Sequence, residues 1–372
     1  MFKIIRYLIF IYFFTLPFYF IKLSFLGGLA FHQIISLVTI VFFICYLFKV
    51  RFLYSNQIYN SILVLVFIYA IFLIGNTDQS FVFLKNLINV TFLGALINFN
   101  HKIGFKKYSD IIISGFSLGS FIMIIIFIIS NYFLFSFVDF SYYGLTYGLF
   151  NNVYVFLNLN LTEEFNSSLI YRNTYGELFV ILFLLTSNNS SNKLRPVYFL
   201  LTILSFSRRA VFTLISYFLK YIKITNLIVI FVVVFLLLSL NIFEDSRFFS
   251  FTEETRLDQY MNLLNSIDNI FLGAGFAEPF EGRYIHNFIL SNFYTIGIIG
   301  LLMSSFIYVL LLISFFKAFK SSNHLYYSLL FLIILNLSIS SNVNGLLSPG
   351  VIIALSIISI NNEKIYNNSR VK

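Results

Sequence analysis

The stretch FILSNFYTIGIIGLLMSSFIYVLLLISFF, residues 288–316, contains no charged side chain and no proline. A helix needs about 20 predominantly apolar residues to cross the hydrocarbon core of a bilayer, so this run is long enough to do so. It is closely preceded by Arg283 and His286, and it is followed by Lys317. The stretch therefore predicts a membrane-spanning helix with polar groups gathered at its first end.

The whole chain has the composition of a polytopic membrane protein. Of its 372 residues, 59% are hydrophobic, 20% are aromatic and only 10% are charged. The core of a soluble protein of this length could not enclose the apolar surface that this composition provides. The net charge of +9 would suggest a nucleic-acid partner in a soluble chain, but most of the lysines here lie between apolar runs. That pattern is a topology signal, so we expect membrane lipids and no nucleic acid as partners.

Twelve apolar runs follow one another along the chain. They cover residues 5–22, 29–48, 60–75, 80–98, 109–132, 174–188, 196–207, 210–222, 224–243, 288–316, 324–341 and 346–360. Basic residues fall at every second connection, which places both termini in the cytoplasm. The runs 196–207 and 210–222 are short, and they fit either two crossings or one hairpin that dips into the bilayer. The predicted fold is an all-α polytopic membrane protein of about twelve transmembrane helices, in a single domain spanning residues 1–372.

Two long segments are expected outside the membrane, residues 133–173 and residues 244–287. The second contains SFTEETRLDQYMNLLNSIDNIFLGAGF, residues 250–276, which begins with a serine and a glutamate in capping-box spacing. An apolar stripe at helical spacing then predicts an amphipathic helix on the bilayer surface, between the ninth and tenth spans. The stripe consists of Leu257, Tyr260, Leu264 and Ile267.

Six basic residues break the positive-inside pattern by facing outward, and all six are arginine. They are Arg172, Arg208, Arg209, Arg247, Arg256 and Arg283. Topology alone does not choose between lysine and arginine, whereas a phosphate or diphosphate favours the planar guanidinium, which donates two parallel hydrogen bonds. Each arginine taken alone is equally compatible with a side chain that snorkels to lipid headgroups. Together they indicate an anionic ligand held at the membrane surface.

His286 is the one histidine within the two long outer segments. Imidazole titrates near neutral pH, so a neutral histidine there can accept a proton from an attacking hydroxyl. The structural alternative is that Asn287 caps the following helix and His286 only donates a hydrogen bond. Gly297 and Gly300 are spaced for close packing of another helix. The outer carboxylates show no spacing typical of a divalent-metal site, so neither a metal nor another cofactor is expected.

The stretch TRLDQYMNLLNSIDNIFLGAGF followed by HNFILSNFYTIGIIGLL resembles the signature region of the O-antigen polymerase and O-antigen ligase superfamily. SFSRRAVF, residues 205–212, resembles the Ser-Arg-x-Ala turn of the same family. The detailed match covers residues 205–301, and the sequence departs from it at Asn269-Ile270, where Asn-Pro is usual. Elsewhere only the topology agrees.

The resemblance implies transfer of a glycan from an undecaprenyl diphosphate carrier to a sugar hydroxyl, on the outer face of a bacterial plasma (inner) membrane. It implies that Arg208 and Arg256 bind the diphosphate and that His286 is the base. Arg172, Arg209 and Arg283 join the substrate-binding set through their positions alone. A chain-length regulator and a flippase are the candidate protein partners of such an enzyme.

Two enzymes share this donor and differ in acceptor. A polymerase of O-antigen or capsule repeats extends a lipid-linked repeat, and a ligase transfers the glycan to lipid A core in lipopolysaccharide. The polymerase is favoured because that branch of the family tolerates wide sequence divergence.

A transporter or flippase for lipid-linked oligosaccharide is the alternative from another functional class. It is disfavoured because the spans look almost free of charge, whereas transporters place ionisable groups near the midplane. A membrane scaffold would not need clustered arginines.

Overall fold

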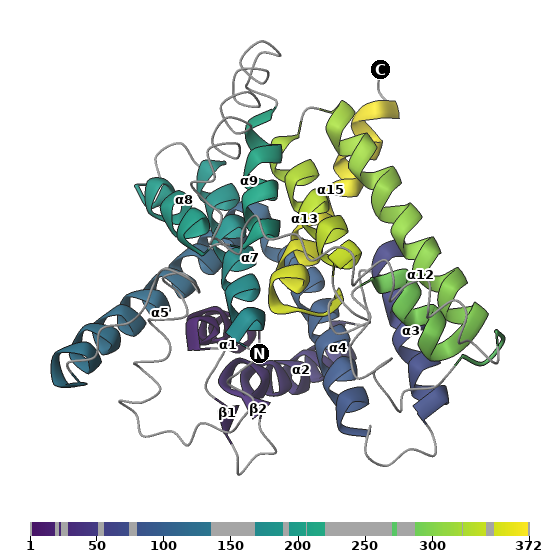
Figure 1. Ribbon diagram of the computed structural model, residues 1–372, viewed down its shortest axis with the longest axis horizontal. Coiled ribbons are helices and arrows are strands. Elements are labelled where there is room, and N and C mark those ends of the chain that lie inside the picture. Colours follow the sequence, from purple (N-terminus) through teal and green to yellow (C-terminus); the bar gives the residue numbers. More distant parts are fainter. Residues whose placement is uncertain are drawn as a thin grey trace, which may run out of the picture.

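The computed structural model is a bundle of helices (Figure 1). It describes residues 2–18, 22–23, 29–50, 56–73, 80–134, 168–188, 193–205, 207–219, 270–273, 287–321, 323–339 and 346–370. Its helices are α1 (Phe2–Thr15), η1 (Leu16–Phe18), α2 (Phe31–Val50), α3 (Gln57–Leu73), α4 (Ser80–Ile103), α5 (Phe105–Leu134), α7 (Ser168–Ser187), α8 (Arg195–Leu204), α9 (Arg208–Leu219), α12 (Phe288–Lys320), α13 (His324–Ile339) and α15 (Pro349–Arg370). Within these ranges the strands are β1 (Lys22–Leu23) and β2 (Leu29–Ala30), an antiparallel pair between η1 and α2.

The predicted helical class is confirmed for the described part of the chain. Eleven of the twelve apolar runs contain a helix, and the run 224–243 lies outside the described residues. Two helical stretches, Phe31–Phe48 and Phe288–Lys320, are long and apolar enough to cross a membrane. The topology of twelve crossings stays a prediction.

Helix ends in the structure coincide with residues that stop or start helices. Pro17 lies in η1, just after α1 ends, while Pro196 and Pro349 occupy the first turns of α8 and α15. Proline fits these positions because a first-turn residue lacks an intrahelical partner for its N–H in any case. Gly104 separates α4 from α5 with a φ of 83°, a left-handed conformation in which glycine is favoured.

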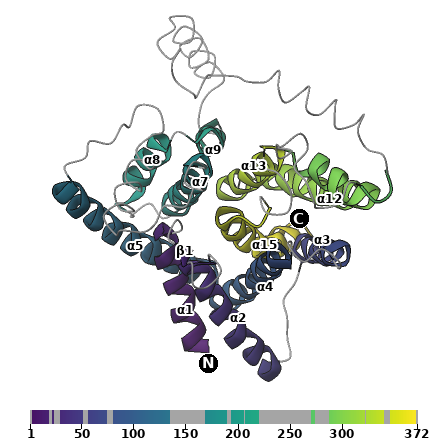
Figure 2. The same cartoon turned by 60° about the horizontal axis from the view of Figure 1, so that its bottom comes forward.

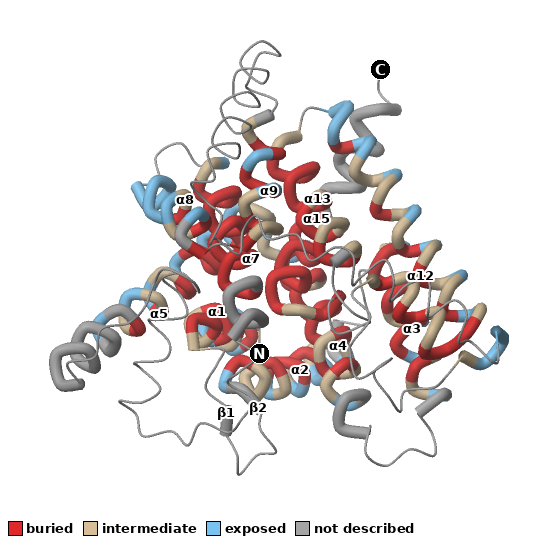
Figure 3. The backbone as a smooth tube through the Cα atoms, in the orientation of Figure 1, coloured by how far each residue is buried: buried red, intermediate tan, exposed pale blue. Residues whose placement is uncertain are grey.

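The centre of the bundle is formed by α7, α13 and α15 (Figures 1 and 3). Every residue from Thr174 to Thr186 in α7 is buried, as is every residue from Val351 to Ser359 in α15. A helix that is covered on all sides has neighbours all round, and α7 contacts α5, α8, α9, α13 and α15. In contrast, α12 exposes one side along its length (Figure 3).

The two short runs form α8 and α9, of 10 and 12 residues. These helices rise about 15 and 18 Å, which is well short of the roughly 30 Å of a hydrocarbon core. Ser205, which follows α8, and Ser207, which precedes α9, are buried and lie against Gly176, the ninth of the 20 residues of α7. Ser207 is therefore packed inside the bundle, while the side of the membrane that Arg208 faces stays a prediction. The tip of the α8–α9 pair therefore reaches the middle of α7, and the choice between two crossings and a hairpin that dips into the bilayer stays open.

The predicted uninterrupted span 288–316 is also corrected. Helix α12 breaks at Ile296 and Gly297, where Gly297 has a φ of 65° and a ψ of −150°. A Cβ built on Gly300 would lie 2.2 Å from the carbonyl oxygen of Asn292, eight residues earlier. Such residues are about 12 Å apart along a straight helix. The first segment of α12, residues 288–296, therefore folds back on the longer segment that follows it.

Candidate functional site

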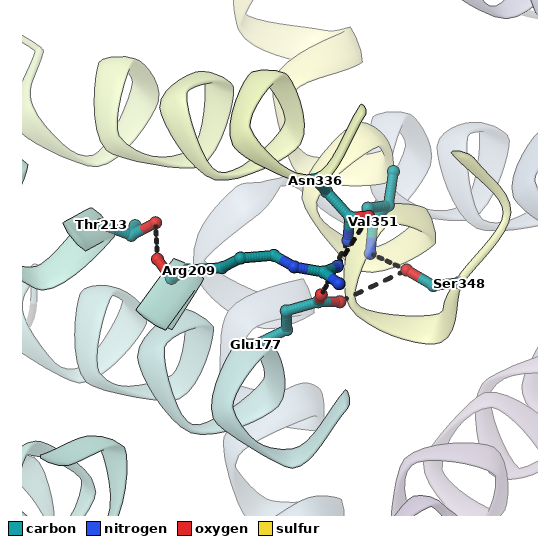
Figure 4. Close-up of polar contacts among 6 residues, drawn as sticks. All are labelled: Glu177, Arg209, Thr213, Asn336, Ser348 and Val351. Carbon is teal, nitrogen blue, oxygen red and sulfur yellow. Dashed lines mark hydrogen bonds and ion pairs between the residues drawn. The ribbon is translucent and has the colours of Figure 1, made fainter. Parts of the chain in front are cut away.

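Four polar side chains meet in the middle of the bundle, three from different helices and one from the residue before a fourth helix (Figure 4). We call them the Glu177 cluster: Glu177 of α7, Arg209 of α9, Asn336 of α13 and Ser348 just before α15. The side chain of Glu177 is only 2% exposed and that of Arg209 is 13% exposed. The cluster therefore places an ion pair inside the helical core.

Both carboxylate oxygens of Glu177 accept hydrogen bonds. Oε1 accepts from Arg209 Nη1 at 3.0 Å and from Asn336 Nδ2 at 2.7 Å, and Oε2 accepts from Ser348 Oγ at 3.3 Å. Arg209 Nη1 also donates to Asn336 Oδ1 at 3.0 Å, so the amide of Asn336 bridges both members of the ion pair. A buried charge pair is tolerated when its remaining lone pairs and protons are satisfied in this way.

The first turn of α15 faces the same carboxylate. Ser348 Oγ accepts a hydrogen bond from the backbone N–H of Val351 at 3.4 Å while its hydroxyl donates to Glu177. A Cβ on Gly350 would lie 2.9 Å from both Cβ and Oε2 of Glu177, so the glycine lets the carboxylate approach the helix. The positive end of the α15 dipole stabilises a negative charge at this position. The first turn of α9 brings Arg209 to it, and the backbone carbonyl of Arg209 accepts a hydrogen bond from Thr213 at 2.8 Å.

The arginines predicted to bind substrate fall into three groups. Arg172 lies in the first turns of α7, and Arg208 is the first residue of α9 and is half-buried. Arg209, predicted to face outward, instead pairs with Glu177 inside the bundle. Arg256 and Arg283 lie outside the described residues, as does the predicted base His286.

Asn287 caps α12, which confirms the capping role considered from the sequence. Its Oδ1 accepts hydrogen bonds from the backbone N–H groups of Ile289 at 3.0 Å and Leu290 at 3.1 Å. One turn further on, Oδ1 of Asn292 accepts from the hydroxyl of Tyr69 in α3. The first segment of α12 is thus stabilised by a cap at its N-terminus and by a hydrogen bond to the neighbouring helix α3.

The glycines of the signature region have identifiable structural roles. Gly297 forms the break in α12, and a Cβ on it would lie 2.3 Å from the carbonyl oxygen of Phe271. Gly273 has a φ of 70°, and the backbone N–H of Ile298 donates to the carbonyl of Ile270 at 2.9 Å. The close approach expected at Gly297 and Gly300 is confirmed, but the approaching chain is the 270–273 turn and the first segment of α12. The expectation that a separate helix packs there is not met in the described residues.

Helices α9 and α12, which adjoin two of the predicted site residues, have one neighbour in common. Helix α13 packs against both α9, which begins with Arg208, and α12, which follows His286. Both views show α13 between them (Figures 1 and 2). Within the described residues Arg209 and Glu177 meet directly. The convergence of Arg208 with Arg256 and His286 stays a prediction.

Sequence reasoning overlooked Glu177, Asn336 and Ser348. A signal for Glu177 was present, because it is the acidic residue within the apolar run 174–188, and an ionisable group in such a run usually has a function or a buried partner. No comparable signal marks Asn336 or Ser348, since amides and hydroxyls occur in many of the other runs.

The contact that seats the α8–α9 turn gives a first prediction. We expect Gly176→Ala to lower the stability by about 1–3 kcal/mol, because the added Cβ would lie 2.4 Å from the Cβ of Ser207. The matched control is Gly94→Ala, whose Cβ would come closest to the hydroxyl end of the Tyr59 side chain, which can shift more easily than backbone. Thermal unfolding of both purified variants in detergent measures the difference. Equal melting temperatures would show that the turn does not lie against α7.

Comparison of the chain with protein-family models, with curated proteins and with solved structures finds no match.

Proposed function

We propose that this protein is a polymerase of O-antigen or capsular repeat units in a bacterial plasma membrane, with about twelve membrane segments and both termini in the cytoplasm. It would transfer a glycan from an undecaprenyl diphosphate donor to a sugar hydroxyl of a second lipid-linked repeat. The proposal rests on the sequence resemblance over residues 205–301, and the described parts of that region support it.

The observation that carries the proposal is the contact between two pieces of the signature region. The turn at residues 270–273 and the TIGIIG stretch around Gly297 are well separated in sequence, yet Ile298 N–H donates to the carbonyl of Ile270. Both Gly273 and Gly297 adopt conformations in which glycine is favoured. Stretches selected only for their resemblance to one family therefore form one local structure.

In the proposed reaction the acceptor hydroxyl oxygen forms a bond to the anomeric carbon as the bond to the diphosphate breaks. The hydroxyl proton passes to the imidazole of His286, and the departing diphosphate takes the electron pair. Arg256 and Arg208 neutralise the charge that develops on it. Proton transfer and charge stabilisation each lower the activation free energy of such reactions by about 2 to 4 kcal/mol. Direct displacement inverts the anomeric carbon, and no metal or cofactor is required by these steps.

We assign a different role to Arg209. Its guanidinium donates to Glu177 and Asn336, so it holds the α8–α9 turn. The adjacent Arg208 keeps the assigned role of binding the diphosphate. Arg208 starts α9, and a helix N-terminus favours an anion. Arg172 and Arg283 remain candidates for contacts with the donor.

The test is the glycan chain length in cells that express single variants. We expect His286→Ala and Arg256→Ala to reach the membrane at native levels but to reduce long glycans to single repeats. Arg256→Lys keeps the charge and loses the bidentate fork, so it should also lose most of the long chains. The control is His101→Ala, which changes an exposed histidine at the end of α4. Native chain lengths in both alanine variants would end the catalytic assignment.

The glycan banding pattern of a deletion strain, resolved on a gel, distinguishes a polymerase from a ligase. Loss of a polymerase leaves one repeat on the lipid A core. Loss of a ligase leaves long chains on the carrier and a bare core. The second pattern would replace the polymerase in this proposal with a ligase.

The structure gives one specific observation in favour of a transporter or flippase for lipid-linked oligosaccharide. The low charge of the predicted spans disfavours this function, but Glu177 and Arg209 form an ion pair in the middle of the bundle. The first turns of α9 and α15 supply part of this cluster. Helix breaks around a central polar site are typical of transporters.

A further inference from the structure

Three consecutive apolar side chains project from the turn that packs on the α12 break. Ile270, Phe271 and Leu272 are 55%, 71% and 58% exposed, and we call them the apolar tip. The turn is held by the hydrogen bond from Ile298 N–H to the Ile270 carbonyl and by the close approach of Gly273 to the backbone of Tyr294 and Gly297. The exposure of the tip is therefore built into the fold at a defined place on α12.

The apolar tip lies at the N-terminal end of the longer segment of α12. From Ile298 to Lys320 this segment rises about 34 Å, close to the thickness of a hydrocarbon core. Lys317 and Lys320 lie at its other end, which the lysine pattern places in the cytoplasm. The apolar tip therefore lies at the level where this segment enters the outer leaflet.

The exposed face of α12 continues to the tip. Its exposed apolar side chains recur at intervals of three and four residues, on one side of the helix, as expected for a face covered by acyl chains. They are Ile299, Leu302, Phe306, Val309, Ile313 and Phe316. The row begins at Ile299, next to the residue that binds Ile270.

We propose that the apolar tip inserts into the hydrocarbon of the outer leaflet and anchors the outer segment 244–287 at its junction with α12. The occupant of this surface is lipid, because the tip extends a row of apolar side chains on a helix long enough to cross the membrane. A protein partner would have to cover the tip and the adjoining row together. This inference rests on the membrane placement in the proposed function.

The chain contains no tryptophan, so one introduced tryptophan reports on its own surroundings. In Phe271→Trp, reconstituted into phosphatidylcholine vesicles, we expect quenching by nitroxide-labelled lipids. A nitroxide near the headgroup end of the acyl chain should quench more strongly than one near its terminal methyl. The matched control is Phe306→Trp, about 12 Å further along the same exposed row, where the order of the two lipids should reverse. Leu272→Trp repeats the measurement if the first variant does not fold.

The outcomes separate the two proposals. Quenching of the tryptophan at 306 without quenching at 271 or 272 overturns the anchor and leaves the membrane placement standing. Absence of quenching at all three positions overturns the membrane placement, and with it the proposed function. Protection of 271 by a bound protein would appear as the first of these results.

Discussion

Glu177→Ala is expected to destabilise the protein by about 3–5 kcal/mol, because it leaves the guanidinium of Arg209 without its counter-ion inside the bundle. The amide of Asn336 and the hydroxyl of Ser348 lose an acceptor at the same time. Thermal unfolding in detergent should show a melting temperature many degrees lower. Asp110→Ala is the matched control, since Asp110 is an exposed acid on α5 and its loss should change the melting temperature little.

A double substitution isolates the charge from the hydrogen bonds. Glu177→Gln alone keeps groups that can bond to Asn336 but strands the positive charge of Arg209. In Glu177→Gln with Arg209→Gln both charges disappear together, and the two amides can still bond within the cluster. We expect the double variant to be more stable than either single variant, which is the signature of coupled residues in a double-mutant cycle. Additive losses would show that the two side chains do not interact.

The folded double variant also distinguishes the two proposed functions. If the ion pair only holds the α8–α9 turn, as the polymerase proposal requires, the variant should make glycans of native length. A transporter that uses the buried pair for ion coupling would lose transport, and long glycans would disappear with it. Loss of long glycans from a well-folded double variant would therefore favour the transporter and return Arg209 to the functional residues.

Sequence reasoning located the helices because each apolar run is bounded by charge or by a helix-breaking residue. It identified the cap at Asn287 for the same local reason, since the cap bonds only to Ile289 and Leu290. The partners of Glu177 lie 32, 159 and 171 residues away in the chain, so no local pattern connects them. The sequence therefore reveals that a carboxylate enters the core, but its partners appear only when four helices are placed.

The break in α12 could not be predicted from the sequence for a related reason. Within an apolar run, Gly297 and Gly300 indicate close packing, and nothing local distinguishes packing by another helix from a reversal of the same chain. The decisive contact comes from residues 270–273, whose carbonyl groups occupy the space that a side chain at 297 would need. Because the chain reverses at Gly297, only the longer segment of α12 is free to cross a bilayer. The exposed apolar row accordingly begins at Ile299, just after the reversal.

Gly297→Ala is expected to undo this arrangement. An alanine at this position must adopt a φ of 65° with a ψ of −150°, a region nearly restricted to glycine that costs about 1–3 kcal/mol. Its Cβ would also lie 2.3 Å from the carbonyl oxygen of Phe271. The contact is to backbone, so no side-chain rotation relieves it. We therefore expect the 270–273 turn to separate from α12, with a loss of stability beyond the conformational cost.

Gly104→Ala supplies the control that separates the two causes. Gly104 has a φ of 83°, but a Cβ there would meet nothing within 4 Å, so this substitution should carry the conformational cost alone. The melting temperature of Gly297→Ala should therefore fall further than that of Gly104→Ala. In a Phe271→Trp background, Gly297→Ala should also change the lipid quenching of the tryptophan, whereas Gly104→Ala should not. Equal effects of the two alanines on both measurements would mean that the turn does not rest on the α12 break, and the placement of the apolar tip would lose its basis.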